Sequence, residues 1–253
     1  MSLLDLTGTR VLLTGGSQGI GAATVRLLHA AGANVFFTYR SRRDLAGALC
    51  AELGERVRAE SVDLADPDAL APTVAKAALH LGGIDVLVNN AAVFAENPFD
   101  GDDFDAWRRG WQQTFALNLF AAADLAWLAM REMRRSGRGG RIVNVASRSA
   151  FRGELTVADY GASKAALVNL TKSIARSCAR DGITAFSVAP GFIATEMSAG
   201  AIASDGAAIA AEIPGGRIGT PEDVAGIIAF LASPLAAYAT GTTIDANGAS
   251  YVR

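Results

Sequence analysis

The sequence predicts an α/β fold: a single, doubly wound domain whose seven-stranded, mainly parallel sheet carries helices on both faces. Short apolar runs rich in Val and Ile alternate with longer, Ala-rich helical stretches, as in repeated strand–helix–strand units. Most of these runs are apolar on nearly every residue, as parallel strands buried on both faces are. A glycine-rich turn joins the first run to the first helical stretch, which indicates a tight strand-to-helix connection.

The predicted elements follow one another without a linker, a repeat or a low-complexity tract, so we expect one domain over residues 1–253. The predicted strands are 10–14, 34–39, 57–62, 84–90, 141–147, 183–189 and 242–246. The predicted helices lie near 19–31, 42–53, 66–80, 103–135, 159–181 and 221–232. Pro67 and Pro221 each stand near a helix start, where a missing N–H costs nothing. Residues 191–219 are rich in small side chains, carry two helix-like patches and are predicted to form a substrate loop.

Composition excludes several classes of protein. The chain has 253 residues, of which 51% are hydrophobic and 19% charged, and its formal net charge is -2. We therefore expect no nucleic-acid or membrane partner, and no apolar run approaches the roughly 20 residues that span a bilayer. Cys50 and Cys178 are too few for a disulfide framework, which favours the cytoplasm, and the N-terminus lacks signal-peptide features. His29 and His80 have no ligand-spaced partners, so no metal site is predicted.

The first strand-to-helix turn reads TGGSQGIG from Thr14 to Gly21. Backbone N–H groups at such a helix N-terminus, together with the helix dipole, suit a pyrophosphate. Gly15 can make the turn, Gly19 allows close approach of a ligand, and Gly21 lets the helix pack on the strand. The spacing differs from G-x-G-x-x-G, and a tight connection without a ligand is the alternative.

Other strand ends add polar groups at the same predicted edge of the sheet. Asp63 follows the third strand, where its carboxylate could accept the adenine amino group, although a turn role is the alternative. The fourth strand ends in NNAA (89–92), whose amides can brace the neighbouring loops. The second strand ends in Arg40 and Ser41 where NAD sites usually have an acid, so we predict NADP, with Arg40 on the 2′-phosphate. The alternative is that the arginines at 40–43 are exposed and the enzyme uses NAD.

Three further residues carry the predicted chemistry. Ser147 ends the fifth strand, and Tyr160 and Lys164 lie four residues apart on one face of a predicted helix. An ammonium beside a phenol favours the phenolate, so we expect Lys164 to lower the pKa of Tyr160. Such a tyrosine can exchange a proton with an alkoxide or an alcohol, while a serine holds the same oxygen.

Together these motifs resemble the short-chain dehydrogenase/reductase family over essentially the whole chain. The motifs are TGGSQGIG (14–21), Asp63, NNAA (89–92), Asn118 in ALNLF, Ser147, YGASK (160–164) and APGFIAT (189–195). The resemblance implies a Rossmann-like domain that transfers a hydride between a nicotinamide and a carbonyl or alcohol carbon. It implies that Tyr160 is the acid/base, that Lys164 binds the nicotinamide ribose and tunes the tyrosine, that Ser147 orients the substrate, and that Asn118 holds a relay water. The cofactor contacts that it implies are Gly15, Ser17, Gln18, Gly19, Ile20, Gly21, Arg40, Ser41, Asp63, Leu64, Asn90, Ala91, Ala92, Tyr160, Lys164, Pro190, Gly191, Ile193 and Thr195. NNAA departs from the commoner N-N-A-G.

The resemblance is strongest to members similar to 3-oxoacyl-carrier-protein reductase, which implies a ketone substrate and a homo-oligomer, either a tetramer or a dimer. Candidate pocket residues are Val93, Phe94, Glu96, 149–154 and 192–197. Arg148 and Arg152 could meet an anionic substrate group, or pair with Glu154. Arg134, Arg135 and Arg138 could dock an acidic carrier protein, although complementing the helix dipole is preferred. The other functional alternatives are an NAD-dependent alcohol, sugar or steroid dehydrogenase and a non-catalytic dinucleotide-binding regulator.

Overall fold

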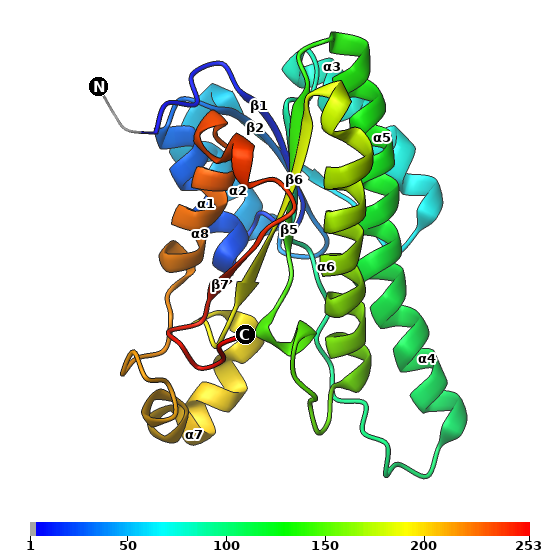
Figure 1. The fold of residues 1–253 in the computed structure, drawn as a ribbon, viewed down its shortest axis with the longest axis vertical. Helices are drawn as coiled ribbons and strands as arrows, with labels where there is room; N and C mark the ends of the chain where they lie inside the picture. Colours follow the sequence, from blue (N-terminus) through cyan, green and yellow to red (C-terminus); the bar gives the residue numbers. More distant parts are fainter. Residues whose placement is uncertain (1–3) are drawn as a thin grey trace.

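The computed structural model describes residues 4–253, and its centre is one seven-stranded sheet (Figure 1). The strand order is β3-β2-β1-β4-β5-β6-β7, and every neighbouring pair is parallel. The strands are β1 (Arg10–Leu13), β2 (Asn34–Tyr39), β3 (Val57–Ser61), β4 (Val86–Asn89), β5 (Gly140–Val145), β6 (Ile183–Pro190) and β7 (Thr243–Ala246). The predicted fold class is therefore confirmed, and all seven runs are strands, with ends that differ by up to two residues.

The strand order reverses between β1 and β4: from β1 the chain adds β2 and β3 on one side, and from β4 it adds β5, β6 and β7 on the other. In open parallel sheets this reversal creates a crevice outside the carboxyl ends of the strands, and ligands bind there. Strand pairing aligns Asn89 of β4 with Asn144 of β5 and Val145 of β5 with Val188 of β6. The segments after β1, β4, β5 and β6 consequently leave the sheet at the same edge.

Helices cover both faces of the sheet (Figure 1). One layer contains α1 (Gly19–Ala30), α2 (Arg43–Leu53) and α8 (Pro221–Leu231), and the other contains α3 (Leu70–Leu81), α5 (Ala122–Ser136) and α6 (Ala158–Cys178). The strand side chains alternate between the two layers: Val11 and Leu13 pack under the first, and Leu12 under the second. This alternation explains why the central strands need apolar residues at every position.

Two helical segments differ from the prediction. The helix expected over 103–135 consists of α4 (Phe104–Phe115), a π-helical turn (Ala116–Ala121) and α5, and α4 packs on α6. Such turns often lie at functional sites, and this one carries Asn118. Within 191–219 the helix-like patches become a short 3₁₀ turn and α7 (Ala199–Ala211), which lies at the lower end of Figure 1.

Two general features of the chain follow from residues 4–253. None of the helices there combines the length and apolar character needed to cross a membrane. Cys50 and Cys178 are both free thiols.

Candidate active site

The glycine-rich turn is packed too closely for side chains at several of its positions. Gly15 and Gly19 have φ angles of 69° and 51°, a conformation that costs other residues free energy. A Cβ on Gly21 would lie 2.0 Å from the Gly15 carbonyl oxygen, and one on Gly19 would lie 3.1 Å from Thr195. Bare backbone at the start of α1 thus faces the sheet edge beside Thr195, which fits the phosphates of a dinucleotide.

Ser17, Gln18 and Ile20 complete this turn and are all partly exposed. The Gln18 Oε1 atom is buried and has no hydrogen-bond partner within residues 4–253. An unpaired buried acceptor at this place is consistent with a ligand that donates to it.

Hydrogen bonds tie the segment after β4 to the glycine turn. Asn90 Nδ2 donates to the carbonyl oxygens of Thr14 (3.0 Å) and Gly15 (2.9 Å), so this amide braces the loops as the sequence predicts. The backbone N–H groups of Asn90 and Ala91 donate to Thr14 Oγ1, both at 3.0 Å. The sequence does not predict this role of the Thr14 hydroxyl, because a threonine at a strand end usually only satisfies the backbone. Ala92 follows, partly exposed, on the same segment.

The arginines that follow β2 differ in their contacts. Arg42 forms an ion pair with Asp44 at 3.1 Å, which is the exposed structural role considered for it. Arg40 and Ser41 are exposed, and Arg40 has no ion pair within residues 4–253. Gly16 donates its N–H to the Thr38 carbonyl at 2.9 Å, so the end of β2 and the glycine turn are neighbours. Arg40 therefore follows directly on the strand that supports the phosphate cradle.

Asp63 and Leu64 follow β3 at the same edge of the sheet. Asp63 Oδ1 accepts the Ala65 N–H at 3.0 Å, so one carboxylate oxygen takes the turn role named as the alternative. Its side chain remains exposed, while Leu64 is buried in the core.

Ser147, Tyr160 and Lys164 come together where β5 ends and α6 begins. Lys164 is 2% exposed, its Nζ donates to the Val145 carbonyl at 2.8 Å, and it lies 5.7 Å from the centroid of the Tyr160 ring. Ser147 Oγ accepts the Ser149 N–H at 3.1 Å, which fixes a lone pair and leaves the hydroxyl proton free to donate elsewhere. The Phe94 ring packs edge-on against the Tyr160 ring at a centroid distance of 5.0 Å.

The expected lowering of the Tyr160 pKa is wrong for this structure. Burial raises the pKa of the phenol, a hydrogen bond with Ser147 lowers it, and the charge of Glu154 raises it again. Burial also lowers the pKa of Lys164 to about 8. Desolvation disfavours the charged form of each group, and it outweighs the attraction between the ammonium and the phenolate that sequence spacing suggests.

Asn118 lies in the π-helical turn and is 1% exposed. Its Oδ1 accepts the Val93 N–H at 2.8 Å, and its Nδ2 donates to the Val93 carbonyl at 3.0 Å and to Ser163 Oγ at 3.2 Å. The amide thus joins the segment after β4 to α6, one residue before Lys164.

The segment after β6 supplies Pro190, Gly191, Ile193 and Thr195. Gly191 donates its N–H to Ala246 at 3.0 Å, and Ile193 is buried and pairs with Gly219 through a β-bridge. These contacts pin the start of the predicted substrate loop against the sheet edge, and Thr195 lies against Gly19 of the phosphate cradle.

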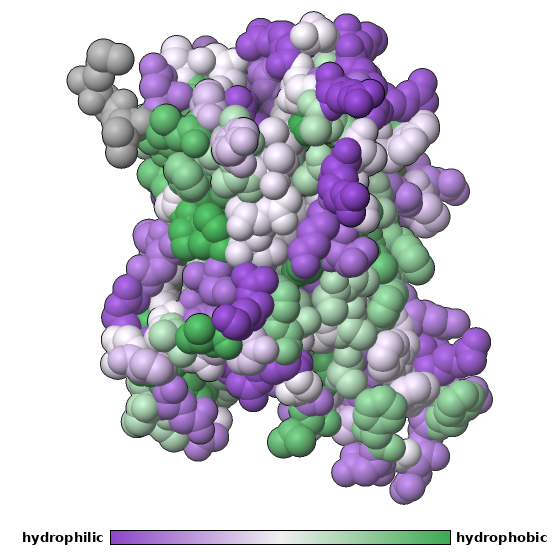
Figure 2. Space-filling view, in the orientation of Figure 1, coloured by the Kyte–Doolittle hydropathy of each residue, from purple (hydrophilic) through white to green (hydrophobic). Residues whose placement is uncertain are grey.

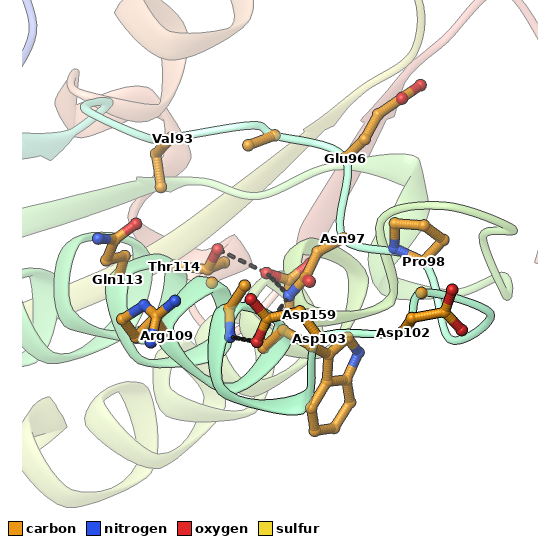
Figure 3. A pocket seen from close by; sticks show the side chains of 15 residues that line it. Val93, Glu96, Asn97, Pro98, Asp102, Asp103, Arg109, Gln113, Thr114 and Asp159 are labelled. Atoms are coloured by element: carbon orange, nitrogen blue, oxygen red, sulfur yellow. Dashed lines mark hydrogen bonds between the residues drawn. The ribbon is translucent and has the colours of Figure 1, made fainter.

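A cavity of about 470 Å³ lies between α4 and the segment after β4. Of the candidate pocket residues, Val93 and Glu96 line this cavity, whereas Phe94 and residues 149–154 and 192–197 do not. Ser147 and Tyr160 are not among its lining residues either, so the cavity is not the predicted pocket around the catalytic groups. Asn97, Thr114 and Asp159 point toward one another at its inner wall (Figure 3).

Asp159 is 1% exposed and links this wall to the tyrosine. Its Oδ2 accepts from Thr114 Oγ1 at 2.7 Å and Asn97 Nδ2 at 3.4 Å, and its Oδ1 accepts the Tyr160 N–H at 2.9 Å. Sequence reasoning missed this junction, although an acid in the first turn of a helix was the available signal.

The remaining charged candidates have internal partners. Arg152 lies 3.7 Å from Glu154, which is the pairing given as the alternative to a substrate contact. Arg134 pairs with Asp181, Arg135 with Glu132, and Arg138 with Asp85. Residues 4–253 contain no cluster of three His, Cys, Asp or Glu side chains suited to a metal ion.

Comparisons with known proteins agree with this geometry. A family model described as enoyl-(acyl carrier protein) reductase matches residues 15–248. The 3-oxoacyl-(acyl-carrier-protein) reductase FabG of Vibrio cholerae is 36% identical over 249 residues, which are 98% of this chain and 100% of the relative. The acetoacetyl-CoA reductase of Shinella zoogloeoides is 39% identical over 242 residues, which are 95% of this chain and 97% of the relative.

Solved structures give the same result for the fold. A short-chain dehydrogenase from Burkholderia cenocepacia, solved in complex with NADP, superposes with a TM-score of 0.88 at 36% identity, covering 97% of this chain and 98% of that one. The chain therefore belongs to the short-chain dehydrogenase/reductase family, whose members are oxidoreductases that interconvert carbonyl and alcohol groups.

Proposed function

We propose that this chain is an NADPH-dependent reductase of a ketone, similar in reaction to 3-oxoacyl-carrier-protein reductases. The observation that carries the proposal is the meeting of Ser147, Tyr160, Lys164 and Asn118 at the sheet edge beside the glycine cradle. The relatives named as 3-oxoacyl-(acyl-carrier-protein) reductase and acetoacetyl-CoA reductase support the substrate class.

Nicotinamide, when bound, supplies the hydride, and the protein supplies the proton. Tyr160 acts as the general acid: its phenol, which burial keeps protonated, donates its proton to the oxygen of the reduced carbonyl. Ser147 holds the same oxygen through its hydroxyl proton, because its lone pair is engaged by the Ser149 N–H. In the reverse direction the same tyrosine accepts the proton of the alcohol.

Lys164 and Asn118 reload the tyrosine in this proposal. Lys164 is buried next to the Tyr160 ring and bonded to Val145, so it can hold the nicotinamide ribose and pass a proton toward the phenol. Val93 and Ser163 use both N–H protons and one oxygen lone pair of the Asn118 side-chain amide. We place the relay water at Asn118, as the family resemblance implies.

Apart from Tyr160 and Lys164, the proposed cofactor-binding residues fall into four groups. Gly15, Ser17, Gln18, Gly19, Ile20 and Gly21 hold the pyrophosphate; Asp63, Leu64, Asn90, Ala91 and Ala92 hold the adenosine side; Pro190, Gly191, Ile193 and Thr195 hold the nicotinamide side. Arg40 and Ser41 bind the 2′-phosphate, since no carboxylate within residues 4–253 forms an ion pair with Arg40. The structural relative solved with NADP supports this choice over NAD.

We also propose that residues 191–219 form the substrate loop of a single domain spanning 1–253, and that the enzyme is a cytoplasmic homo-oligomer, a tetramer or a dimer. Phe104, Phe120 and Trp127 of the α4–α5 region are 63%, 59% and 55% exposed, and weakly hydrophobic surface lies over the lower part of α6 (Figure 2). A second copy covering these helices would bury them. Light scattering at micromolar concentration tests this, and a monomer would refute it.

A binding titration and a turnover assay test the enzymatic proposal. Quenching of the fluorescence of Trp107, Trp111 and Trp127 should report tighter binding of NADPH than of NADH, and Arg40→Asp should reverse that order. Tyr160→Phe should bind NADPH as the wild type does and lose ketone reduction by at least about 100-fold. Equal turnover by Tyr160→Phe refutes the mechanism, and wild-type binding without turnover favours the regulator. Preference for NADH favours an NAD-dependent alcohol, sugar or steroid dehydrogenase.

A further inference from the structure

The C-terminal segment, residues 247–253, packs against the turn that follows Ser147 (Figure 1). The phenol of Tyr251 donates to the backbone carbonyl of Phe151 at 2.8 Å. The rings of these two residues are nearly parallel, with their centroids 6.5 Å apart. The guanidinium carbon of Arg253 lies 4.2 Å from the centroid of the Phe151 ring. The residue that ends the serine turn is thus held by two side chains of the C-terminal segment.

The same segment also holds the beginning of the turn. Arg148 Nη1 donates to Ser250 Oγ at 2.8 Å. The guanidinium carbon of Arg148 lies 4.8 Å from the centroid of the Phe192 ring, which belongs to the segment after β6. The C-terminal segment therefore contacts the turn at its first residue and, through Phe151, at its last.

The conformation of Ser147 depends on this turn. Ser147 caps a single 3₁₀ turn, Arg148–Ala150: its Oγ accepts the Ser149 N–H at 3.1 Å, and its carbonyl accepts the Ala150 N–H at 3.0 Å. The Phe151 N–H closes the turn by donating to the Arg148 carbonyl at 3.0 Å. One 3₁₀ turn contains few hydrogen bonds of its own. A contact that fixes Phe151 consequently helps to fix the orientation of the Ser147 hydroxyl.

The C-terminal segment is itself fixed to the sheet. Arg253 pairs with Asp245 of β7 at 3.0 Å, and Asn247 Nδ2 donates to the Tyr251 carbonyl at 3.0 Å. Ala249 has a φ angle of 65° and is the one residue other than glycine with a positive φ in residues 4–253. Such a conformation costs an alanine free energy and persists where the surroundings impose it, often beside functional sites. The contacts of the segment therefore outweigh the strain of its own backbone.

We propose that Tyr251 is a positioning residue for ketone reduction: through the Phe151 carbonyl it holds the turn from which Ser147 presents its hydroxyl to the substrate. This inference rests on the proposed function and adds the C-terminal segment to the parts of the chain on which Ser147 depends. Tyr251 bonds Phe151 and Asn247, neither of which belongs to the glycine cradle. Its loss should therefore lower turnover and leave NADPH affinity unchanged.

The test is a double-mutant cycle between Tyr251 and Ser147, with acetoacetyl-coenzyme A as the ketone and NADPH oxidation as the signal. Tyr251→Ala should lower kcat by more than about tenfold, and Tyr251→Phe, which loses one neutral hydrogen bond and keeps the ring, by about threefold to fivefold. In a Ser147→Ala background, Tyr251→Ala should lower kcat by less than about threefold, because the hydroxyl that it positions is gone. Tyr238→Ala, at a fully exposed tyrosine, is the matched control and should change neither background.

Three results would overturn the inference. Equal losses with and without the Ser147 hydroxyl would make Tyr251 a structural residue. Unchanged kcat in Tyr251→Ala would show that the turn holds itself. A parallel loss of NADPH affinity, followed by tryptophan fluorescence, would show a wider disturbance of the site. If Tyr251→Ala does not fold, Tyr251→Phe completes the cycle: its loss of kcat should disappear in the Ser147→Ala background, and a persistent loss overturns the inference.

A second measurement separates this inference from the proposed function. If the wild type does not reduce acetoacetyl-coenzyme A, the proposed function fails, and hydrogen exchange of the full chain then tests the contact itself. Tyr251→Phe should speed amide exchange in a peptide covering residues 147–152 by at least about threefold, and Tyr238→Ala should leave it unchanged. Equal exchange in the wild type and Tyr251→Phe would refute the positioning of the serine turn by Tyr251.

Discussion

Burial of Lys164 gives the folded protein a pH dependence that can be measured without substrate. The side chain is 2% exposed, it bonds one backbone carbonyl, and burial lowers its pKa from 10.5 to about 8. In the unfolded chain the same group titrates near its ordinary value. The folded state therefore binds fewer protons than the unfolded state between pH 8 and pH 10.5.

The sign and size of the effect follow from this difference in proton binding. Stability rises with pH wherever the unfolded state binds more protons, so the cost of burying the Lys164 charge is fully present below pH 8 and is relieved as the pH approaches 10.5. A shift of about 2.5 pKa units corresponds to about 3 kcal/mol, at about 1.4 kcal/mol per unit. Between pH 7 and pH 9.5, about 2 kcal/mol of this cost should be relieved.

Urea unfolding of the wild type and Lys164→Met at several pH values isolates this effect. Methionine keeps the length of the side chain and removes its charge, so the difference in unfolding free energy should move in favour of the wild type by about 2 kcal/mol from pH 7 to pH 9.5. Lys172→Met, at an exposed position of the same helix, should keep the wild-type slope. A constant difference between the wild type and Lys164→Met across this range would show that Lys164 is not buried as a charge, and the reasoning would be wrong.

Three more predictions follow from the site. Gly21→Ala places a methyl group 2.0 Å from the Gly15 carbonyl, so it should lower NADPH affinity more than tenfold and destabilise by about 2–3 kcal/mol. Gly47→Ala, on an open helix surface, should instead stabilise by about 0.5–1 kcal/mol; similar behaviour of the two would refute the packing argument. Asp159→Ala should reduce kcat more than tenfold without changing NADPH affinity, and Asp159→Asn should restore part of it, since its one amide oxygen can still accept the Tyr160 N–H. Loss of NADPH affinity, or no rescue by asparagine, would count against a positioning role. Finally, kcat/KM for reduction should fall as pH rises through about 8, where Lys164 loses its proton; a flat profile to pH 9.5 would exclude Lys164 from proton supply.

The fold was predictable because the apolar residues of each strand indicate whether one or both of its faces are buried. β4, with the sequence VLVN, is fully buried, and its run of apolar residues admits no exposed face. The break between α4 and α5 was not predictable: ALNLF continues the helical pattern, and the π-helical turn coincides with two hydrogen bonds between Asn118 and Val93 on a distant segment. Local sequence thus specifies an element, while contacts with another element specify its irregularities.

The positions of the candidate site residues could be predicted, and their electrostatics could not. Spacing placed Tyr160 next to Lys164, but the pKa of each depends on how much protein surrounds it. The arginines make the same point, since Arg148 and Arg152 stand four residues apart and look alike in the sequence. Only the fold places Glu154 beside one and the Phe192 ring beside the other.

Burial favours the neutral form of both members of the proposed proton-transfer pair. It raises the pKa of Tyr160 and lowers that of Lys164, so at neutral pH the phenol keeps its proton while the ammonium holds a proton that it can release. A site in that state is prepared to give protons, which is what an oxygen receives when a ketone is reduced. Oxidation of an alcohol needs the phenolate, which burial and Glu154 both disfavour. The same desolvation that costs stability at Lys164 therefore favours carbonyl reduction at neutral pH.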